Sequence, residues 1–127
     1  MPLIRYERTM KKFENNGELA MQSAYSVRQI NSYIKMMFSQ DFVLNKISVK
    51  GEVSNCKYHT SGHIYFTLKE ESSALSCVMF AGDRLGLSFR LQNGQQVTVS
   101  GNIDVYERDG TYQLYARKIV SDGIGAL

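Results

Sequence analysis

The 127-residue chain has little proline, little cysteine and no long apolar run. One proline and 43% hydrophobic residues argue against disorder and for one globular domain that buries its own core. Two cysteines, Cys56 and Cys77, without a secretory signal predict reduced thiols. No stretch approaches the ~18 apolar residues of a membrane span, and the N-terminus lacks the apolar segment of a signal peptide. We therefore expect a cytoplasmic protein that makes no membrane contact.

Acidic clusters and phosphate-binding glycine loops are also missing. Asp83, Asp104 and Asp109 are typical of turns and surfaces, so no two-metal hydrolytic centre is predicted. No Walker-type loop is present. A zinc site would have to combine the two histidines with both cysteines. However, the segment that holds Cys56, His59 and His63 crosses from a loop into a strand, and neither cysteine has a second cysteine close to it in the sequence. We expect a chain without a metal, a cofactor or a catalytic residue of its own.

The net charge of +3 is too small to demand or exclude a polyanionic partner, so the distribution of charge has to decide. Residues 1–23 mix basic and acidic side chains without an apolar period, and we expect a disordered tail there. The alternative for this segment is a basic arm that lies on DNA, although its acidic residues nearly cancel its charge.

A helix is predicted after the tail. Ser26 and Gln29 have the spacing of a capping box, and the helix should end near Gln40. An apolar stripe is expected to pack against a sheet, with a partner-binding helix as the alternative; the stripe comprises Val27, Ile30, Ile34 and Met37.

Five strands separated by turn signals follow the helix. They are expected at residues 46–55, 62–69, 74–80, 96–107 and 111–120, with a short helical link over 82–89 before the fourth strand. Gly51 suggests a bend or bulge in the first strand, and Asp109-Gly110 is a hairpin signal. This order predicts an all-β protein with one flanking N-terminal helix, a five-stranded OB-fold Greek-key barrel.

Alternation in the second strand divides its side chains between two faces. Ile64, Phe66 and Leu68 should face the core. The opposite face carries an aromatic ring, hydrogen-bonding groups and a cation, as on a single-stranded nucleic acid platform; its residues are His63, Tyr65, Thr67 and Lys69. An ordinary solvated strand face is the alternative.

Several short segments of the sequence resemble those of a known family. The segments Gly51-Glu52-Val53-Ser54-Asn55 and 61–69 (SGHIYFTLK), then 78–80 (VMF), Asn93-Gly94, 105–107 (VYE), 112–114 (YQL) and 123–127 (GIGAL) are similar to the N-terminal domain of the bacterial exodeoxyribonuclease VII large subunit. The resemblance covers about residues 25–127. It implies an OB-fold over residues 24–122, which presents single-stranded DNA to a nuclease domain after a linker that starts at 123–127. It also implies a role in DNA repair and small helical subunits that do not contact this domain.

Candidate binding residues follow from where OB barrels hold oligonucleotides, namely the face of strands two and three and the loops 56–61 and 108–110. Cations for phosphate are Lys50, Lys57, Lys69 and Arg108. Tyr65 is the main stacking residue, and Tyr58, Phe80, Tyr106 and Tyr112 are further aromatic candidates. His59 and His63 can donate or stack, and Asn55 and Ser61 complete the set.

Several of these residues have a purely structural alternative. Phe80 is expected in the core more than on the binding face. Tyr106 and Tyr112 flank one hairpin and can simply pair across it.

The sequence thus predicts a single-stranded DNA-binding domain that does not hydrolyse DNA by itself. The alternatives are an OB module that binds RNA or a protein partner and, more weakly, a self-contained hydrolase. Salt dependence and competition between single-stranded and duplex DNA would separate the binding functions.

Overall fold

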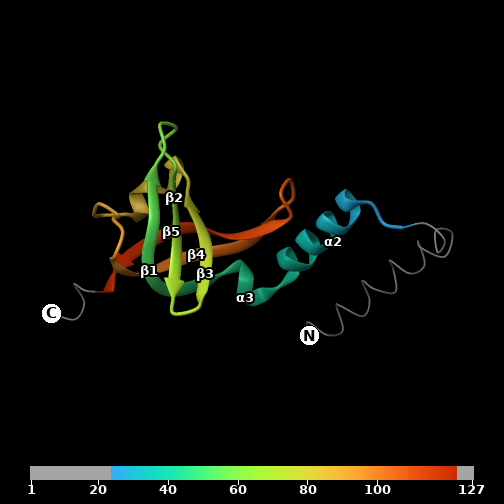
Figure 1. The fold of residues 1–127 in the computed structure, drawn as a ribbon, viewed down its shortest axis with the longest axis horizontal. Coiled ribbons are helices and arrows are strands. Elements are labelled where there is room, and N and C mark those ends of the chain that lie inside the picture. Colours follow the sequence, from blue (N-terminus) through green and yellow to red (C-terminus); the bar gives the residue numbers. More distant parts are fainter. Residues whose placement is uncertain (1–23, 123–127) are drawn as a thin grey trace.

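The computed structural model describes residues 24–122 (Figure 1). The predicted tail (1–23) and linker (123–127) lie outside the described residues. Two helices come first, α2 (Val27–Gln40) and α3 (Phe42–Asn45), followed by β1 (Ile47–Tyr58), β2 (Ile64–Glu70) and β3 (Ser73–Met79). A 3-10 helix, η2 (Ala81–Gly86), leads to β4 (Gln96–Tyr106) and β5 (Thr111–Ser121). Within this described part, no helix is long and apolar enough to cross a membrane.

The strands close into a barrel in the order β1-β2-β3-β5-β4. β1 pairs antiparallel with both β2 and β4, and the barrel closes through a parallel contact between β3 and β5. This arrangement confirms the predicted five-stranded OB barrel. The strand boundaries agree with the prediction to within a few residues, and the largest difference is that β1 continues to Tyr58.

Alternation along β2 is as predicted, because Ile64, Phe66 and Leu68 are at most 3% exposed. They join buried side chains of the other four strands and Leu91 of the β3–β4 connection. Cys77 also belongs to this core, in phase with Met79. The core therefore lies inside the barrel, and the odd-numbered residues of β2 are left for the outer surface.

The predicted irregularity in β1 occurs at another place. The register shifts between Ser54 and Lys57, where Asn55 adopts a positive φ of 51°. Gly51 lies where β1 passes from β4 to β2, and a Cβ there would come within 3.2 Å of the Leu68 Cβ. Close strand approach explains the glycine, and the bulge itself lies at residues 55–56.

The start of α2 follows the predicted capping box. The Gln29 N–H donates to Ser26 Oγ at 3.0 Å, and the Ser26 N–H donates to Gln29 Oε1 at 2.7 Å. The helix ends at Gln40, also as predicted. The short α3 was not predicted; Asp41 caps it by accepting a hydrogen bond from the Leu44 N–H at 2.9 Å.

The predicted face of α2 is wrong. Val27, Ile30 and Ile34 are 76%, 39% and 40% exposed and only Met37 of the four is half-buried, so most of this stripe does not pack on the sheet. The helix instead contacts the β4–β5 hairpin through a neighbouring face, which carries Asn31, Ser32, Lys35 and Phe38. On this face Lys35 Nζ reaches Asp104 Oδ2 at 2.8 Å and the Val105 carbonyl at 3.2 Å, and Phe38 packs against the core.

Candidate nucleic-acid interface

The outer face of the barrel around Tyr65 is built by strand register. Lys57 of β1 lies opposite Tyr65, Val78 of β3 lies opposite it on the other side, and Tyr115 of β5 follows beside Val78. Val78 is only 1% exposed, yet it lies outside the hydrophobic core cluster. Its position in the register between Tyr65 and Tyr115 accounts for this burial. The two tyrosines thus stand on a common outer surface.

Five rings form a connected series on this surface. Tyr65 makes edge contacts with His59 and His63, at centroid distances of 6.1 and 6.4 Å. His63 lies 5.1 Å from Phe80, and Phe80 lies 5.6 Å from Tyr115. We call these five residues the aromatic platform. It crosses the barrel from the β1–β2 loop over β2 to the end of β3 and to β5.

The structure places Phe80 on the platform, so the expectation that it belongs to the core is wrong. β3 ends at Met79, and Phe80 opens η2 with its ring 41% exposed. Cys77 and Met79 face the core, so Phe80, the next residue, falls out of phase with them and lies on the outer side, where the chain turns into η2.

Tyr115 was missed by the sequence analysis. It lies between the buried residues Leu114 and Ala116, and this alternation in β5 was a signal that could have identified it.

The β1–β2 loop is held in one conformation by its own side chains. The Ser61 N–H donates to His59 Nδ1 at 3.1 Å, and the His63 N–H donates to Ser61 Oγ at 3.3 Å. The Ala81 N–H donates to His63 Nδ1 at 2.9 Å. Because Nδ1 accepts in both histidines, each neutral ring carries its proton on Nε2. Ser61 therefore orders the loop, and the two histidines keep a donor for a ligand.

η2 fastens the same loop from the other side. Arg84 donates to the Gly62 carbonyl at 3.0 Å, and Gly62 has a φ of +93°. A Cβ on Gly62 would approach the Ala81 Cβ to 3.0 Å, so glycine suits both the backbone and the contact.

A hollow of about 280 Å³ lies next to Tyr65. Gln113 in its wall donates to the Tyr115 hydroxyl at 2.9 Å, which orients that ring. Asn55 enters the wall because the bulge turns it outward. The lining residues are Asn55, Lys57, Tyr65, Phe66, Thr67, Ser76, Cys77 and Gln113.

The predicted lysines do not gather around Tyr65. Lys57 is exposed beside Tyr65 and has no ion pair within residues 24–122. Lys69, at the far end of β2, lies 3.8 Å from Glu52 Oε2. Lys50 pairs with Thr98 of β4, so it belongs to the β1–β4 side of the barrel. Only Lys57 directly flanks the platform.

Tyr58 has a structural role. Its hydroxyl accepts from the Leu91 N–H at 2.7 Å and donates to the Leu91 carbonyl at 3.1 Å. Arg90 and Arg84 lie 4.4 and 5.4 Å from its ring centre. The ring thus anchors the β3–β4 connection and is already in contact with two guanidinium groups.

The β4–β5 hairpin lies apart from the β1–β2 loop, as Figure 1 shows by the separate hairpin tips. Its turn is tied to α2, because Asn31 donates to the Glu107 carbonyl at 3.0 Å. The exposed Arg108 lies in this turn.

The two tyrosines of this hairpin do not pair with each other. Tyr106 is opposite Thr111, and Tyr112 is opposite Val105. Tyr112 contacts Phe38 of α2 at 6.0 Å, so its ring supports the helix. The structure therefore does not bring Arg108, Tyr106 or Tyr112 into the aromatic platform.

The thiols are shielded. Burial raises the pKa of Cys77 to about 12. Burial also raises the pKa of Cys56, with a smaller opposing effect from Arg90. Among residues 24–122, no group of three or more histidine, cysteine or acidic side chains is placed to hold a metal ion.

Comparison with known proteins agrees with this architecture. The family described as OB-fold nucleic acid binding domain matches residues 25–120. Among curated relatives, the exodeoxyribonuclease 7 large subunit of Lachnoclostridium phytofermentans is 65% identical over 107 residues, which are 84% of this chain and 27% of that protein. The protein of the same name from Ruminiclostridium cellulolyticum is 51% identical over 84% of this chain and 26% of its own length. The chain thus spans about a quarter of the length of these relatives.

Solved structures share the fold at low sequence identity. A structure of the S. pombe Stn1-Ten1 complex aligns with a TM-score of 0.52 and 19% identity, over 63% of this chain and 60% of that one. A putative aspartyl-tRNA synthetase from Leishmania major Friedlin aligns with a TM-score of 0.50 and 13% identity, over 62% and 18% of the two chains. These likenesses concern the barrel alone. With the family match over most of its length, the chain belongs to the OB-fold nucleic acid binding domain family and is similar to part of the exodeoxyribonuclease 7 large subunits.

Proposed function

We propose that this chain is the single-stranded DNA-binding domain of an exodeoxyribonuclease VII large subunit. It captures a strand on the aromatic platform and presents it to a nuclease region in the rest of the protein. The observation that carries the proposal is the connected series of outer rings from His59 to Tyr115, two of which, Tyr65 and Phe80, are about 40% exposed.

The chemistry of the platform suits unpaired bases. A base in a duplex has its faces covered by its neighbours, whereas an unpaired base can stack on Tyr65, Phe80 or Tyr115. Each such stack is worth ~1–3 kcal/mol and tolerates any base. Lys57 and the Nε2–H groups of the two histidines supply donors for phosphate at the edge of the platform. These groups do not discriminate between base edges, which suits an enzyme that must accept any sequence.

Fluorescence anisotropy with a labelled oligonucleotide tests the proposal. Unlabelled single-stranded DNA should compete well, and duplex DNA of equal length should compete poorly. With roughly three to five phosphate contacts, log K should fall against log salt with a slope of about −2 to −3.5. A flat salt response would indicate a protein partner instead, and stronger competition by RNA than by DNA would indicate an RNA-binding module.

Two substitutions make the test specific to the platform. Phe80→Ala should weaken single-strand binding by ~1–3 kcal/mol. Phe42→Ala removes an exposed aromatic ring from α3, where Phe42 is 91% exposed, and should leave binding unchanged. Equal losses in the two variants would contradict binding on the platform.

A further inference from the structure

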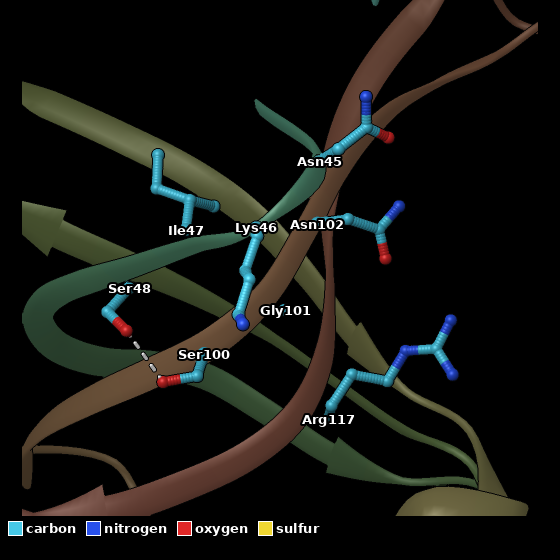
Figure 2. A pocket seen from close by; sticks show the side chains of 8 residues that line it. All are labelled: Asn45, Lys46, Ile47, Ser48, Ser100, Gly101, Asn102 and Arg117. Carbon is cyan, nitrogen blue, oxygen red and sulfur yellow. Dashed lines mark hydrogen bonds between the residues drawn. The ribbon is translucent and has the colours of Figure 1, made fainter. Parts of the chain in front are cut away.

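A second polar hollow lies on the other side of Tyr115, where α3 meets β1 and where β4 crosses β5. Its volume is about 740 Å³, which is within the range of ligand sites. Figure 2 shows the side chains that line it: Asn45, Lys46, Ile47, Ser48, Ser100, Gly101, Asn102 and Arg117. The lining contains two cations, no carboxylate and no aromatic ring.

A β-bulge puts one of these cations in place. Ser100 pairs with Lys118 and Gly101 pairs with Ala116, so Arg117 is the extra residue of β5. As a result Arg117 and Lys118 are both exposed, between the buried residues Ala116 and Ile119. A regular strand would turn one of the two cations toward the core.

Polar groups of the hollow are available to a ligand. The side-chain amine of Lys46 and the side-chain amide of Asn102 have no hydrogen-bond or ion-pair partner within residues 24–122. Within the described part of the chain, Arg117 has only a loose ion pair, 3.6 Å from Asp83 Oδ1, and because the Arg117 side chain is 64% exposed this pair is worth little in water. In Figure 2 the Lys46 amine points toward Gly101 and Ser100, while the side chains of Asn102 on β4 and Arg117 on β5 point to the opposite side of the view.

Two other groups shape the walls. The Asn45 amide donates to the Ser39 and Asp41 carbonyls at 2.7 Å each, so it is occupied in closing the end of α2. The Ser48 and Ser100 hydroxyls lie 2.7 Å apart and bond to each other.

Strand register places the hollow next to the last ring of the aromatic platform. Asn102 lies opposite Tyr115 in the β4–β5 register, and Arg117 follows Tyr115 by two residues on β5. Lys50, which the platform does not use, lies on β1 two residues beyond Ser48 on the same side of the barrel. A DNA strand that passes the last ring of the platform therefore meets cationic side chains and no further aromatic rings.

We infer that this hollow, which we call the exit pocket, binds the phosphodiester backbone of the strand after its bases have left the platform. Cations and amide donors recognise phosphate oxygens, and the absence of rings means that bases are not held there. The inference rests on the proposed single-strand binding, because the strand reaches the exit pocket from Tyr115.

Oligonucleotide length separates the two sites. An oligonucleotide of about 5 nucleotides can occupy the platform alone, whereas one of about 20 exceeds the ~4–16 nucleotides of an OB-fold site and also reaches the exit pocket. In the full chain, the double substitution Lys46→Ala/Arg117→Ala should weaken binding of the 20-mer by about 5- to 20-fold at low salt. Its salt slope should fall in magnitude by about 1.4, since two phosphate contacts on a single strand contribute ~0.7 each. Binding of the 5-mer should stay within about twofold.

Two further variants control for charge and geometry. Arg28→Ala removes an exposed cation from α2 and should change neither oligonucleotide's affinity by more than about twofold. The charge-conserving pair Lys46→Arg/Arg117→Lys should recover most of the loss. Equal weakening of both lengths by the double alanine variant, or the same effect from Arg28→Ala, would overturn the exit pocket.

The remaining outcomes distinguish strand binding at the exit pocket from strand binding at the platform. They also distinguish a site for the DNA backbone from a site for free inorganic phosphate. If Tyr65→Ala leaves 20-mer binding unchanged while the double variant abolishes it, the hollow still binds the backbone of the strand, but the platform proposal fails and with it the passage of the strand from Tyr115. If neither oligonucleotide binds the wild-type chain, both proposals fail. Displacement of the 20-mer by inorganic phosphate, but not by sodium chloride of equal ionic strength, would assign the pocket to free phosphate and overturn the inference.

Discussion

Neighbouring residues of β2 should have opposite effects when truncated. Tyr65 is 42% exposed on the aromatic platform, whereas Phe66 is 3% exposed in the barrel core. Tyr65→Ala removes a stacking surface worth ~1–3 kcal/mol, which corresponds to a roughly 5- to 150-fold increase in Kd. Its ring contacts to His59 and His63 lie at the surface, so the free energy of unfolding should fall by less than about 1 kcal/mol.

Phe66→Ala should do the reverse. Truncation of a buried phenylalanine costs ~3–5 kcal/mol through lost burial and a residual cavity. Because a small domain has only about 5–15 kcal/mol of stability, this variant can fail to fold. Phe66→Leu keeps most of the volume, should cost less than ~1.5 kcal/mol and should bind single-stranded DNA with unchanged affinity.

Urea unfolding and anisotropy titrations on the same samples measure both effects. Tyr65→Phe is the control for the ring, and it should bind like the wild type because the stacking surface is kept. If Tyr65→Ala were strongly destabilised and Phe66→Leu bound poorly while stable, the assignment of the two faces of β2 would be refuted.

Three further predictions concern the bulge, the buried thiol and the absence of catalysis. Gly101→Ala should lower the thermal midpoint strongly, because the new Cβ would lie 1.9 Å from the Tyr115 carbonyl oxygen; an unchanged midpoint would contradict the close crossing of β4 and β5. Above pH 9 the unfolded chain loses the Cys77 proton while the folded chain, with a pKa of about 12, keeps it. Stability should therefore fall with rising pH by at most ~1.4 kcal/mol per pH unit from this group, and less steeply in Cys77→Val; identical pH profiles would refute this. The pure domain should not shorten end-labelled DNA with or without magnesium, and cleavage that is lost on mutating one of its own residues would disprove this.

Local features were predictable because they depend on neighbours in the chain. The capping box of Ser26 and Gln29 is formed within one helical turn, and the alternation of Ile64, Phe66 and Leu68 follows from the pleat of a single strand. The count and order of the strands followed in the same way from turn signals between apolar segments. Tyr65 could be placed on the outer face on the same basis.

The composition of the site depended on contacts between distant segments. Phe80 and Tyr115 are 35 positions apart in the numbering, and they meet because β3 pairs with β5 in parallel. The apolar period of α2 indicated one packing face, but Asn31 and Lys35 contact the hairpin through another. Neither the contact between these two rings nor the packing face of α2 can be predicted from the periodicity of a single segment.

By itself, then, the sequence determined the element order, the barrel class and the inward face of β2, since turn chemistry and side-chain alternation act over a few residues. Only the tertiary structure decided that Lys50 and Lys57 serve different sides of the barrel, that Tyr58 is an anchor and that Arg117 and Lys118 both face outward. Strand register and bulges set these positions. They arise when the barrel closes, because closure forces strands far apart in the chain to share one hydrogen-bonded sheet.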